Sequence, residues 1–403
     1  MSVWKTIREN HGAGVDGWPR VTILHSFYRS DLPSGENATV LRQFRMLAEA
    51  GVDVSLLSVH TDDLQNSPFY SVKSARNVAL GSGYSPIESL ENLGAEVVHL
   101  HNLFPNIATD WIRFTKAAVV TSLHNYRPLC AAATLSRNGS DCTLCLTKSS
   151  FQAVKYGCYR GSRVASIPLA IRNHREPQHD PVLEYSELLL APSLMVKRTY
   201  EAAGVKNLRV LYQPSEFDET ARGLGENDVG HLFLGRLSEE KGLLGLLRAW
   251  PNTEILTIVG QGPLEVAARH LAGQRGLQTR FRGFVDDAEL STILAGAESL
   301  IFPSTWREGA PAVYAEAMAF GLPVIAVAGN SVAESVWQHG TGLVLDELSV
   351  GALAQAIVEI RGRRNALGNV CRLTYKENYT VDRWLVHLNE LYNEAALSRA
   401  QRR

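Results

Sequence analysis

The 403-residue sequence lacks any run of about 18 apolar residues, so no segment is long enough to span a bilayer as a helix. Residues 1–20 also lack the apolar stretch of a secretory signal, and we expect a cytoplasmic protein. Low-complexity stretches and short repeats are absent. The formal net charge is only −1, so overall charge gives no reason to expect a nucleic-acid partner. What remains is the composition of an ordinary globular protein, 45% hydrophobic and 20% charged.

Charge is nevertheless uneven along the chain. Residues 111–175 contain ten basic side chains and a single acid, Asp141; the basic ones are Arg113, Lys116, Arg127, Arg137, Lys148, Lys155, Arg160, Arg163, Arg172 and Arg175. A surface this positive suits a phosphate-bearing ligand or peripheral association with an anionic membrane. A solvated basic face that is balanced by acids elsewhere in the fold is an equal alternative.

Cysteine is scarce, but four of the five cysteines fall within 29 residues, at Cys130, Cys142, Cys145 and Cys158. In a cytosolic chain such a group favours a metal over disulfides, and four thiolates can hold a tetrahedral structural zinc. The spacing is not a standard zinc signature, so disulfides and plain buried thiols stay open as alternatives.

The hydrophobic pattern predicts an α/β protein in which short apolar strands alternate with helices. Strands of this kind are typical of parallel sheets covered on both faces. The pattern runs once through residues 21–214 and then restarts at 231. We therefore predict two doubly wound halves, 1–214 and 215–380. Ligands of such folds bind outside the carboxyl ends of the strands, which places the site in the cleft between the halves. The amphipathic segment 381–403 is expected to be a helix that packs back on the first half.

Two glutamates, Glu308 and Glu316, stand eight residues apart after the predicted strand 299–304. Gly309 and Pro311, with Ala310 between them, mark a helix N-terminus. The free amides and the positive dipole end of such a helix form an anion site. Carboxylates beside this site can accept sugar hydroxyls while the amides receive a phosphate.

This segment resembles the E-x7-E motif of the family 4 retaining glycosyltransferases, whose GT-B fold has two facing Rossmann-like domains. The resemblance covers nearly the whole chain. It implies transfer of a hexose from a nucleotide-diphosphate sugar, with UDP favoured over GDP, to a sugar or lipid-linked acceptor, and no cofactor for catalysis. It also implies that Glu308 binds the sugar hydroxyls and that Glu316 binds the ribose.

Other segments match the same family. Residues 235–242 resemble its phosphate clamp, with Arg236 and Lys241 as the two cations; five residues apart across a strand-to-helix turn, they can converge on one diphosphate. The remaining donor positions implied by the resemblance are the glycine turn Gly260 and Gly262, the base-binding Phe284 and Val285, and the loop positions Gly35 and Glu36. The family usually has two adjacent glycines in that loop, and only Gly35 is present here.

A histidine at the end of a strand, His124, resembles the residue that contacts the hydroxymethyl group of the donor sugar in the family. His101 and Asn102 end the preceding strand and are lesser candidates on the acceptor side. The cysteine group matches a subgroup that carries these cysteines just after the histidine. The chain contains no Asp-x-Asp triplet, which argues against a catalytic divalent metal.

Several readings of the function stay open at this point. The acceptor is either a lipid-linked saccharide, as in polysaccharide or glycolipid assembly, or a small soluble molecule. The same fold also hosts nucleotide-sugar epimerases and phosphorylases, and a catalytically inactive protein that only binds a nucleotide sugar is a further alternative.

Overall fold

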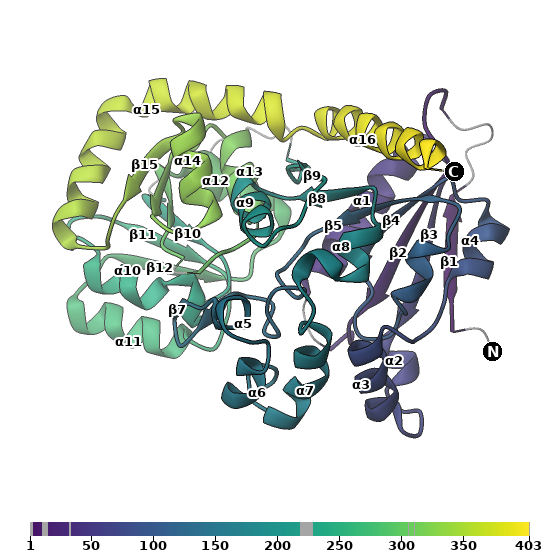
Figure 1. Cartoon of the computed structure of the whole chain (residues 1–403). Coiled ribbons are helices and arrows are strands. Elements are labelled where there is room, and N and C mark those ends of the chain that lie inside the picture. Colours follow the sequence, from purple (N-terminus) through teal and green to yellow (C-terminus); the bar gives the residue numbers. More distant parts are fainter. Residues whose placement is uncertain are drawn as a thin grey trace.

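The computed structural model describes residues 3–9, 15–31, 34–217, 229–304, 306–309 and 311–402. These residues form two α/β halves that lie side by side, each with its own sheet (Figure 1). The predicted boundary at 214/215 falls between the last strand of the first sheet and the first strand of the second. In the part of the chain that the structure describes, no helix is both long and apolar enough to cross a membrane.

The first sheet has seven strands in the order β1-β3-β2-β4-β5-β8-β9. Their bounds are β1 Lys5–Glu9, β2 Val21–Phe27, β3 Val54–His60, β4 Val97–Asn102, β5 Ala118–Ser122, β8 Leu188–Ala191 and β9 Leu208–Val210. The five inner strands from β3 to β8 are almost entirely buried, as expected for strands covered on both faces. One expectation was wrong, because the sheet is not purely parallel: β1 pairs antiparallel with β3 at the edge. The polar, fully exposed sequence of β1 gave no apolar signal.

Helices cover both faces of this sheet. Their bounds are α1 Gly35–Glu49, α2 Thr61–Leu64, α3 Tyr70–Leu80, α4 Ile87–Leu93, α5 Leu144–Thr147, α6 Gln152–Tyr156, α7 Arg163–Arg172, α8 Pro181–Tyr185 and α9 Leu194–Ala202. Along β2, Val21 and Ile23 pack with α1 on one face, whereas Leu24 packs with α4 and α8 on the other. Because alternate residues face opposite covered sides, the strand is buried throughout. Helices α5 to α7 and the small hairpin β6 (Ser136–Arg137) and β7 (Ser140–Asp141) form an insertion that extends below the sheet (Figure 1).

The second sheet is wholly parallel, with the order β12-β11-β10-β13-β14-β15. Its strands are β10 His231–Leu234, β11 Leu256–Val259, β12 Thr279–Gly283, β13 Ser299–Phe302, β14 Val324–Val327 and β15 Gly342–Leu345. Its helices are α10 Leu243–Ala249, α11 Glu265–Arg275, α12 Asp287–Gly296, α13 Ala312–Ala319, α14 Ser331–His339 and α15 Val350–Asn378. The order reverses at β10 and β13, so the carboxyl ends of these two strands mark the expected ligand crevice.

The last helix, α16 (Val381–Gln401), returns to the first sheet after the second one is complete (Figure 1). Its apolar positions Trp384, Leu388, Leu391 and Tyr392 are buried in the same cluster as Val21 and the inner strands of the first sheet. Helix α16 contacts β4 and β5. The end of the chain therefore ties the two halves together.

Candidate active site

The donor side of the cleft is built at the carboxyl end of β10. The chain leaves the strand through Gly235 and the exposed Arg236, and then forms a short 3₁₀ turn, Glu239–Lys241, before α10. Gly242 ends this turn with φ +75°, and a Cβ atom there would lie 2.1 Å from the carbonyl oxygen of Pro303. Only glycine fits such an approach, which brings Lys241 next to the loop after β13.

Glu308 lies in that loop, and its carboxylate is buried, with 7% of the residue exposed. Lys241 Nζ donates to Oε2 over 2.6 Å, and Ser304 Oγ donates to Oε1 over 2.6 Å. Asn330 holds the loop by donating from Nδ2 to the Ser304 carbonyl over 3.1 Å. The predicted phosphate cation and the predicted sugar-binding carboxylate are thus in direct contact, so both can reach one ligand.

Glu316 lies on α13, which begins after Pro311 as its N-cap; Ala310 lies outside the described residues. No side chain caps the start of α13, so its first amides can receive an anion. Burial raises the pKa of Glu316 to about 7, against the opposing effect of Arg42 from α1 across the cleft. Glu308 precedes this helix, whereas Glu316 lies within it.

The glycine turn after β11 packs backbone against backbone with the turn after β10. Gly260 has φ +128°, and a Cβ atom there would lie 2.0 Å from the Gly235 carbonyl oxygen. A Cβ atom on Gly262 would lie 2.4 Å from the Leu237 carbonyl oxygen. Phe284 follows β12 at the same sheet edge with 79% of its surface exposed, whereas Val285 packs against the core. The exposed ring is available to stack on a nucleobase.

We expect Gly260→Ala to destabilise the protein by about 3 kcal/mol or more, because the backbone strain of φ +128° and the clash with Gly235 add. The shift is measurable as a lower midpoint in urea unfolding. The matched control is Gly273→Ala, at a helical position in α11 where a Cβ atom meets nothing within 4 Å. There alanine should instead stabilise by about 0.5–1 kcal/mol. Equal effects of the two substitutions would contradict the close packing of the turns.

On the predicted acceptor side, three neighbouring strands carry four histidines. His25 lies in β2, His99 and His101 lie in β4, and His124 follows β5. His124 Nε2 and His101 Nδ1 share a hydrogen bond of 2.8 Å, and the two rings stack. His99 bonds Tyr392 of α16 through Nδ1 over 2.7 Å. Burial, together with the nearby His25, lowers the pKa of His124 to about 3. His124 is therefore neutral at physiological pH, and its Nδ1 makes no hydrogen bond to any described residue.

Asn102, a lesser candidate in our sequence analysis, has a structural role instead. Its side chain donates to the backbone carbonyls of Ser26 and Phe104 and accepts from the Phe104 amide. These bonds shape the turn after β4. His101 does reach the site, through its hydrogen bond to His124.

The loop expected over residues 34–39 is the first turn of α1, capped by Ser34, so this secondary-structure prediction was wrong. Nothing lies within 4 Å of a Cβ atom on Gly35, and no close approach requires glycine there. Glu36 instead lies next to the acceptor side, where it accepts a long bond of 3.4 Å from Asn125 Nδ2. Burial raises the pKa of Glu36 to about 7, although Arg127 opposes the shift.

Sequence reasoning named Glu36 but missed the polar group to which it belongs, which also contains Asn125, Arg127 and Tyr28. Within the described residues, Glu36 Oε1 and Arg127 Nε and Nη1 are buried without a hydrogen-bond partner. Such atoms are costly unless a ligand satisfies them. The group lines a cavity of about 970 Å³ that also reaches Trp306 of the second half. The available signal was the continuation of the His124 segment into Asn125 and Arg127.

The two halves touch beside the predicted site. A Cβ atom on Gly309 would lie 3.5 Å from the His124 carbonyl oxygen, so the loop of Glu308 touches the strand end of His124. Ion pairs flank this contact: Arg307 reaches Asp141 of the insertion over 2.8 Å, and Arg198 of α9 reaches Glu334 of α14 over 2.6 Å. The predicted donor residues and the predicted histidine thus belong to one site.

All five cysteines are free thiols. Among the described residues, which include the four clustered cysteines, no group of three or more His, Cys, Asp or Glu side chains is arranged to hold a metal ion. Cys145 and Cys158 instead pack in an apolar cluster with Phe104 and Leu169, and burial raises the pKa of Cys145 to about 11. The zinc prediction therefore stays a prediction without a geometric counterpart.

Comparison with solved structures defines the class of fold. Anabaena HepE in complex with UDP-glucose matches 94% of this chain and 99% of its own, with a TM-score of 0.58 and 17% sequence identity. The predicted GT-B fold, with two facing Rossmann-like domains, is confirmed.

Comparison of sequences then points to a family. Residues 215–365 match the family model "Glycosyl transferases group 1". The chain is 31% identical over 172 residues to the GDP-mannose-dependent monoacylated alpha-(1-6)-phosphatidylinositol monomannoside mannosyltransferase of Corynebacterium glutamicum, a match that covers 38% of this chain and 45% of that protein. It is 22% identical over 371 residues to the amylovoran biosynthesis glycosyltransferase AmsK of Erwinia amylovora, covering 83% and 90%. The chain thus spans less than half the length of the first of these relatives. Together, these matches show that the chain is similar to the group 1 glycosyltransferases.

Proposed function

We propose that this protein is a retaining, metal-independent glycosyltransferase that moves a hexose from a nucleotide-diphosphate donor to an acceptor hydroxyl. The observation that carries the proposal is the contact of Lys241 with Glu308, in a loop whose Gly309 lies against the backbone carbonyl of His124. A cation for the diphosphate, a carboxylate for sugar hydroxyls and the strand end that bears a neutral imidazole thus lie close together at the crevice of a GT-B fold.

The roles follow from charge and position. Arg236 and Lys241 bind the diphosphate and stabilise it as its charge grows when the bond to the sugar breaks. Glu308 accepts from the sugar hydroxyls once Lys241 turns to the phosphate, and Glu316 accepts from the ribose. His124 offers Nδ1 to the hydroxymethyl group. The acceptor hydroxyl attacks from the face that the phosphate leaves, and the leaving phosphate oxygen takes its proton. The configuration is then retained through an oxocarbenium-like transition state.

Two donor classes are in competition. Our sequence analysis favours UDP, and a fold relative binds UDP-glucose. The Corynebacterium relative, at 31% identity, is named for GDP-mannose.

For the acceptor, we favour a lipid-linked saccharide over a small soluble molecule, because the first relative is named for a phosphatidylinositol mannoside acceptor and the cavity beside the His124 segment is large and lined by helices α3 and α7.

The test is thermal stability in the presence of UDP, GDP, ADP and dTDP. A nucleotide at 100 times its dissociation constant should stabilise the protein by about 2.7 kcal/mol, and Lys241→Ala should remove this effect. The control is Lys197→Ala, which only loses a surface pair with Glu201. Stabilisation by none of the four nucleotides would refute the proposal.

Incubation of the donor without acceptor separates a transferase from a nucleotide-sugar epimerase: an epimerase changes the sugar, whereas a transferase at most hydrolyses the donor.

A further inference from the structure

We propose that one face of the N-terminal half, formed by α3, α6 and α7, docks on an anionic lipid bilayer. This inference deepens the proposed function, on which it rests for the identity of the acceptor, because it states where a lipid-linked acceptor is met. Helix α7 contacts both α3 and α6, so the three helices form one packed unit. Figure 1 places this unit at the lower end of the molecule, away from α15 and α16.

The outer sides of these helices are apolar where a soluble helix is normally polar. On α7, Val164, Ile167 and Ile171 recur at helical spacing and are exposed, Val164 to 75%. At the start of α3, Phe69 is 79% exposed and Val72 is 66% exposed. Isolated exposed apolar residues need no explanation, but a stripe on two adjacent helices marks an interaction surface.

The same helices carry positive charge only. The segments 64–87 and 142–175, which contain α3, α6 and α7, have eight Lys or Arg residues and no Asp or Glu. Seven of the eight are exposed and make no ion pair within the described part of the chain: Lys73, Arg76, Lys148, Lys155, Arg160, Arg163 and Arg175. Cations that flank apolar side chains suit the anionic headgroups and the acyl boundary of a membrane interface.

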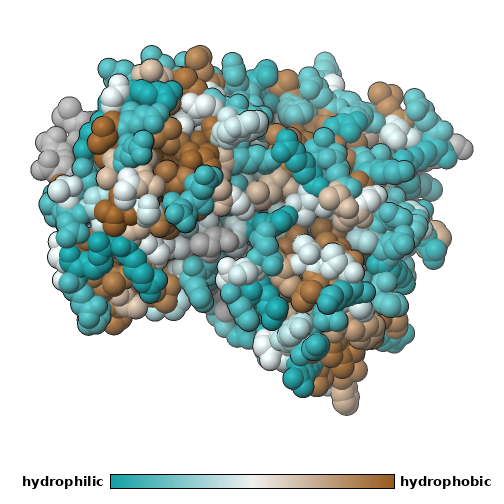
Figure 2. Space-filling model, turned by 60° about the vertical axis from the view of Figure 1, so that its left-hand side comes forward, coloured by the Kyte–Doolittle hydropathy of each residue, from teal (hydrophilic) through white to brown (hydrophobic). Residues whose placement is uncertain are grey.

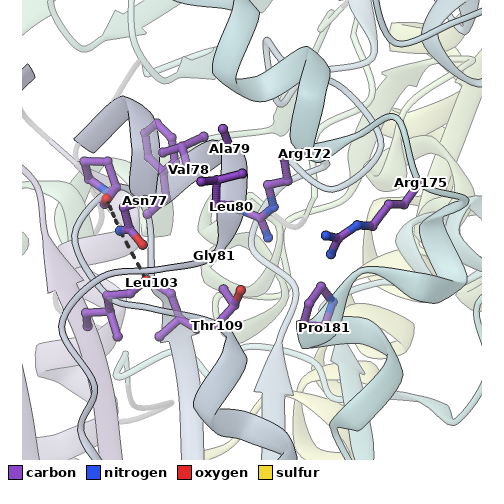
Figure 3. Close-up of a pocket in the computed structure, with 13 residues that line it drawn as sticks. Asn77, Val78, Ala79, Leu80, Gly81, Leu103, Thr109, Arg172, Arg175 and Pro181 are labelled. Atoms are coloured by element: carbon purple, nitrogen blue, oxygen red, sulfur yellow. Dashed lines mark hydrogen bonds between the residues drawn. The ribbon is translucent and has the colours of Figure 1, made fainter. Parts of the chain in front are cut away.

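The figures agree with this distribution. Figure 2 shows brown side chains gathered at the lower end of the molecule; the view is turned about the vertical axis only, so this is the end that holds α3, α6 and α7 in Figure 1. Figure 3 shows Leu80 at the end of α3 with Arg172 beside it and Arg175 farther away, around a small cavity of about 20 Å³. Arg172 pairs with Asp180 over 3.0 Å, whereas Arg175 is exposed.

This face is continuous with the candidate acceptor site. Val164 and Arg160 belong to the exposed face and also line the cavity of about 970 Å³. From there the cavity runs between Ala75 of α3 and Pro168 of α7 to the polar group around Glu36. An amphipathic acceptor can therefore keep its apolar part at the membrane while its sugar reaches Asn125, the residue next to His124.

A second copy of the chain is a poorer occupant of this face. In a symmetric dimer the same patch covers itself, which would bring the uncompensated cations of two subunits together. Repulsion between like charges opposes that contact, whereas an anionic bilayer neutralises them.

The test is sedimentation of the full chain with vesicles of phosphatidylcholine alone or with 30% phosphatidylglycerol, at low and high salt. We expect binding to the anionic vesicles at least tenfold tighter than to the neutral ones, and weaker binding at high salt. The double variant Phe69→Asp/Val164→Asp should bind at least tenfold more weakly. Both positions tolerate aspartate: Phe69 has φ 60°, and Val164 lies in the first turn of α7. The matched control is Val266→Asp, 81% exposed on α11, which should bind like the unmodified chain.

Three outcomes would overturn the inference: no sedimentation with anionic vesicles at low salt, equal binding by the double variant, or a dimer in solution that the double variant abolishes. Nucleotide-induced stabilisation is measured on the same samples. A chain that responds to a nucleotide but ignores vesicles refutes the docking face alone. A chain that binds vesicles but no nucleotide refutes the proposed transferase and leaves the docking face supported.

Discussion

Sugar transfer by Glu308→Gln is expected to fall by a factor of about 10² or more. The carboxylate accepts from both Lys241 and Ser304, and in the proposed mechanism it accepts from sugar hydroxyls instead. An amide keeps the shape but replaces one acceptor atom with a donor. Hydrogen bonds to a charged group contribute about 1.5–3 kcal/mol each, which sets the size of the loss. The loss should appear in kcat as well as in kcat/KM if the contact strengthens in the transition state.

The measurement is the initial rate of transfer with the donor chosen by the nucleotide panel. Glu308→Gln should still be stabilised by the nucleotide, because the diphosphate cations remain, whereas Lys241→Ala should not. Glu265→Gln, which only loses a surface pair with Arg269, serves as the control. A full transfer rate in Glu308→Gln would remove this residue from the sugar site.

Acid should unfold the protein through the buried histidines of the first sheet. Burial lowers the pKa of His25 to about 4 and of His99 and His124 to about 3, and it lowers that of His101 well below 6.5. Below pH 6.5 the unfolded chain therefore binds more protons at these sites than the folded one, and stability falls as the pH falls. Each such proton is worth about 1.4 kcal/mol per pH unit.

Two carboxyl groups act in the opposite direction. Glu36 and Glu316 have folded pKa values of about 7, against 4.5 when exposed, so they favour the folded state as the pH falls from 7 to 4.5. Between pH 6.5 and 4.5 the unfolded chain therefore binds about one to two more protons than the folded protein. The free energy of unfolding then falls by about 1.4–3 kcal/mol for each pH unit of acidification. Below pH 4.5 these two carboxyl groups become protonated in the unfolded chain as well and no longer offset the histidines, so the free energy of unfolding falls more steeply.

The free energy of unfolding, measured by denaturant titration at several pH values, checks this prediction. His99→Gln cannot gain the proton, so its stability should depend less on pH, by about 1.4 kcal/mol per pH unit, between pH 6 and 4.5. The free energy of unfolding of Glu36→Gln should depend more strongly on pH, because this variant lacks a carboxyl group that favours the folded state as the pH falls. Identical slopes in all three proteins would show that the histidines are protonated in the folded state as well.

Much of the fold could be predicted from the sequence, because buried parallel strands are apolar over their whole length. The pattern predicted to start at residue 21 and to restart at 231 begins where β2 and β10 begin, and the strand predicted over 299–304 is β13, which ends two residues earlier. The exceptions have a physical cause. Strand β1 is polar and exposed at a sheet edge, and α1 begins at Gly35 because Ser34 caps it. Neither feature produces apolar periodicity.

The donor half of the proposed site could be predicted from the sequence by itself, since Arg236, Lys241, Glu308 and Glu316 lie in short segments whose spacing already implies their chemistry. Only the tertiary structure decided the rest. The histidine group draws on three strands and on Tyr392 from the far end of the chain, and Glu36 joins Arg127 and Asn125 across 89 residues of sequence. The α3–α7 face is likewise assembled from two distant segments. Burial and charge, which set pKa values and surfaces, depend on neighbours in space, and spacing along the chain does not record them.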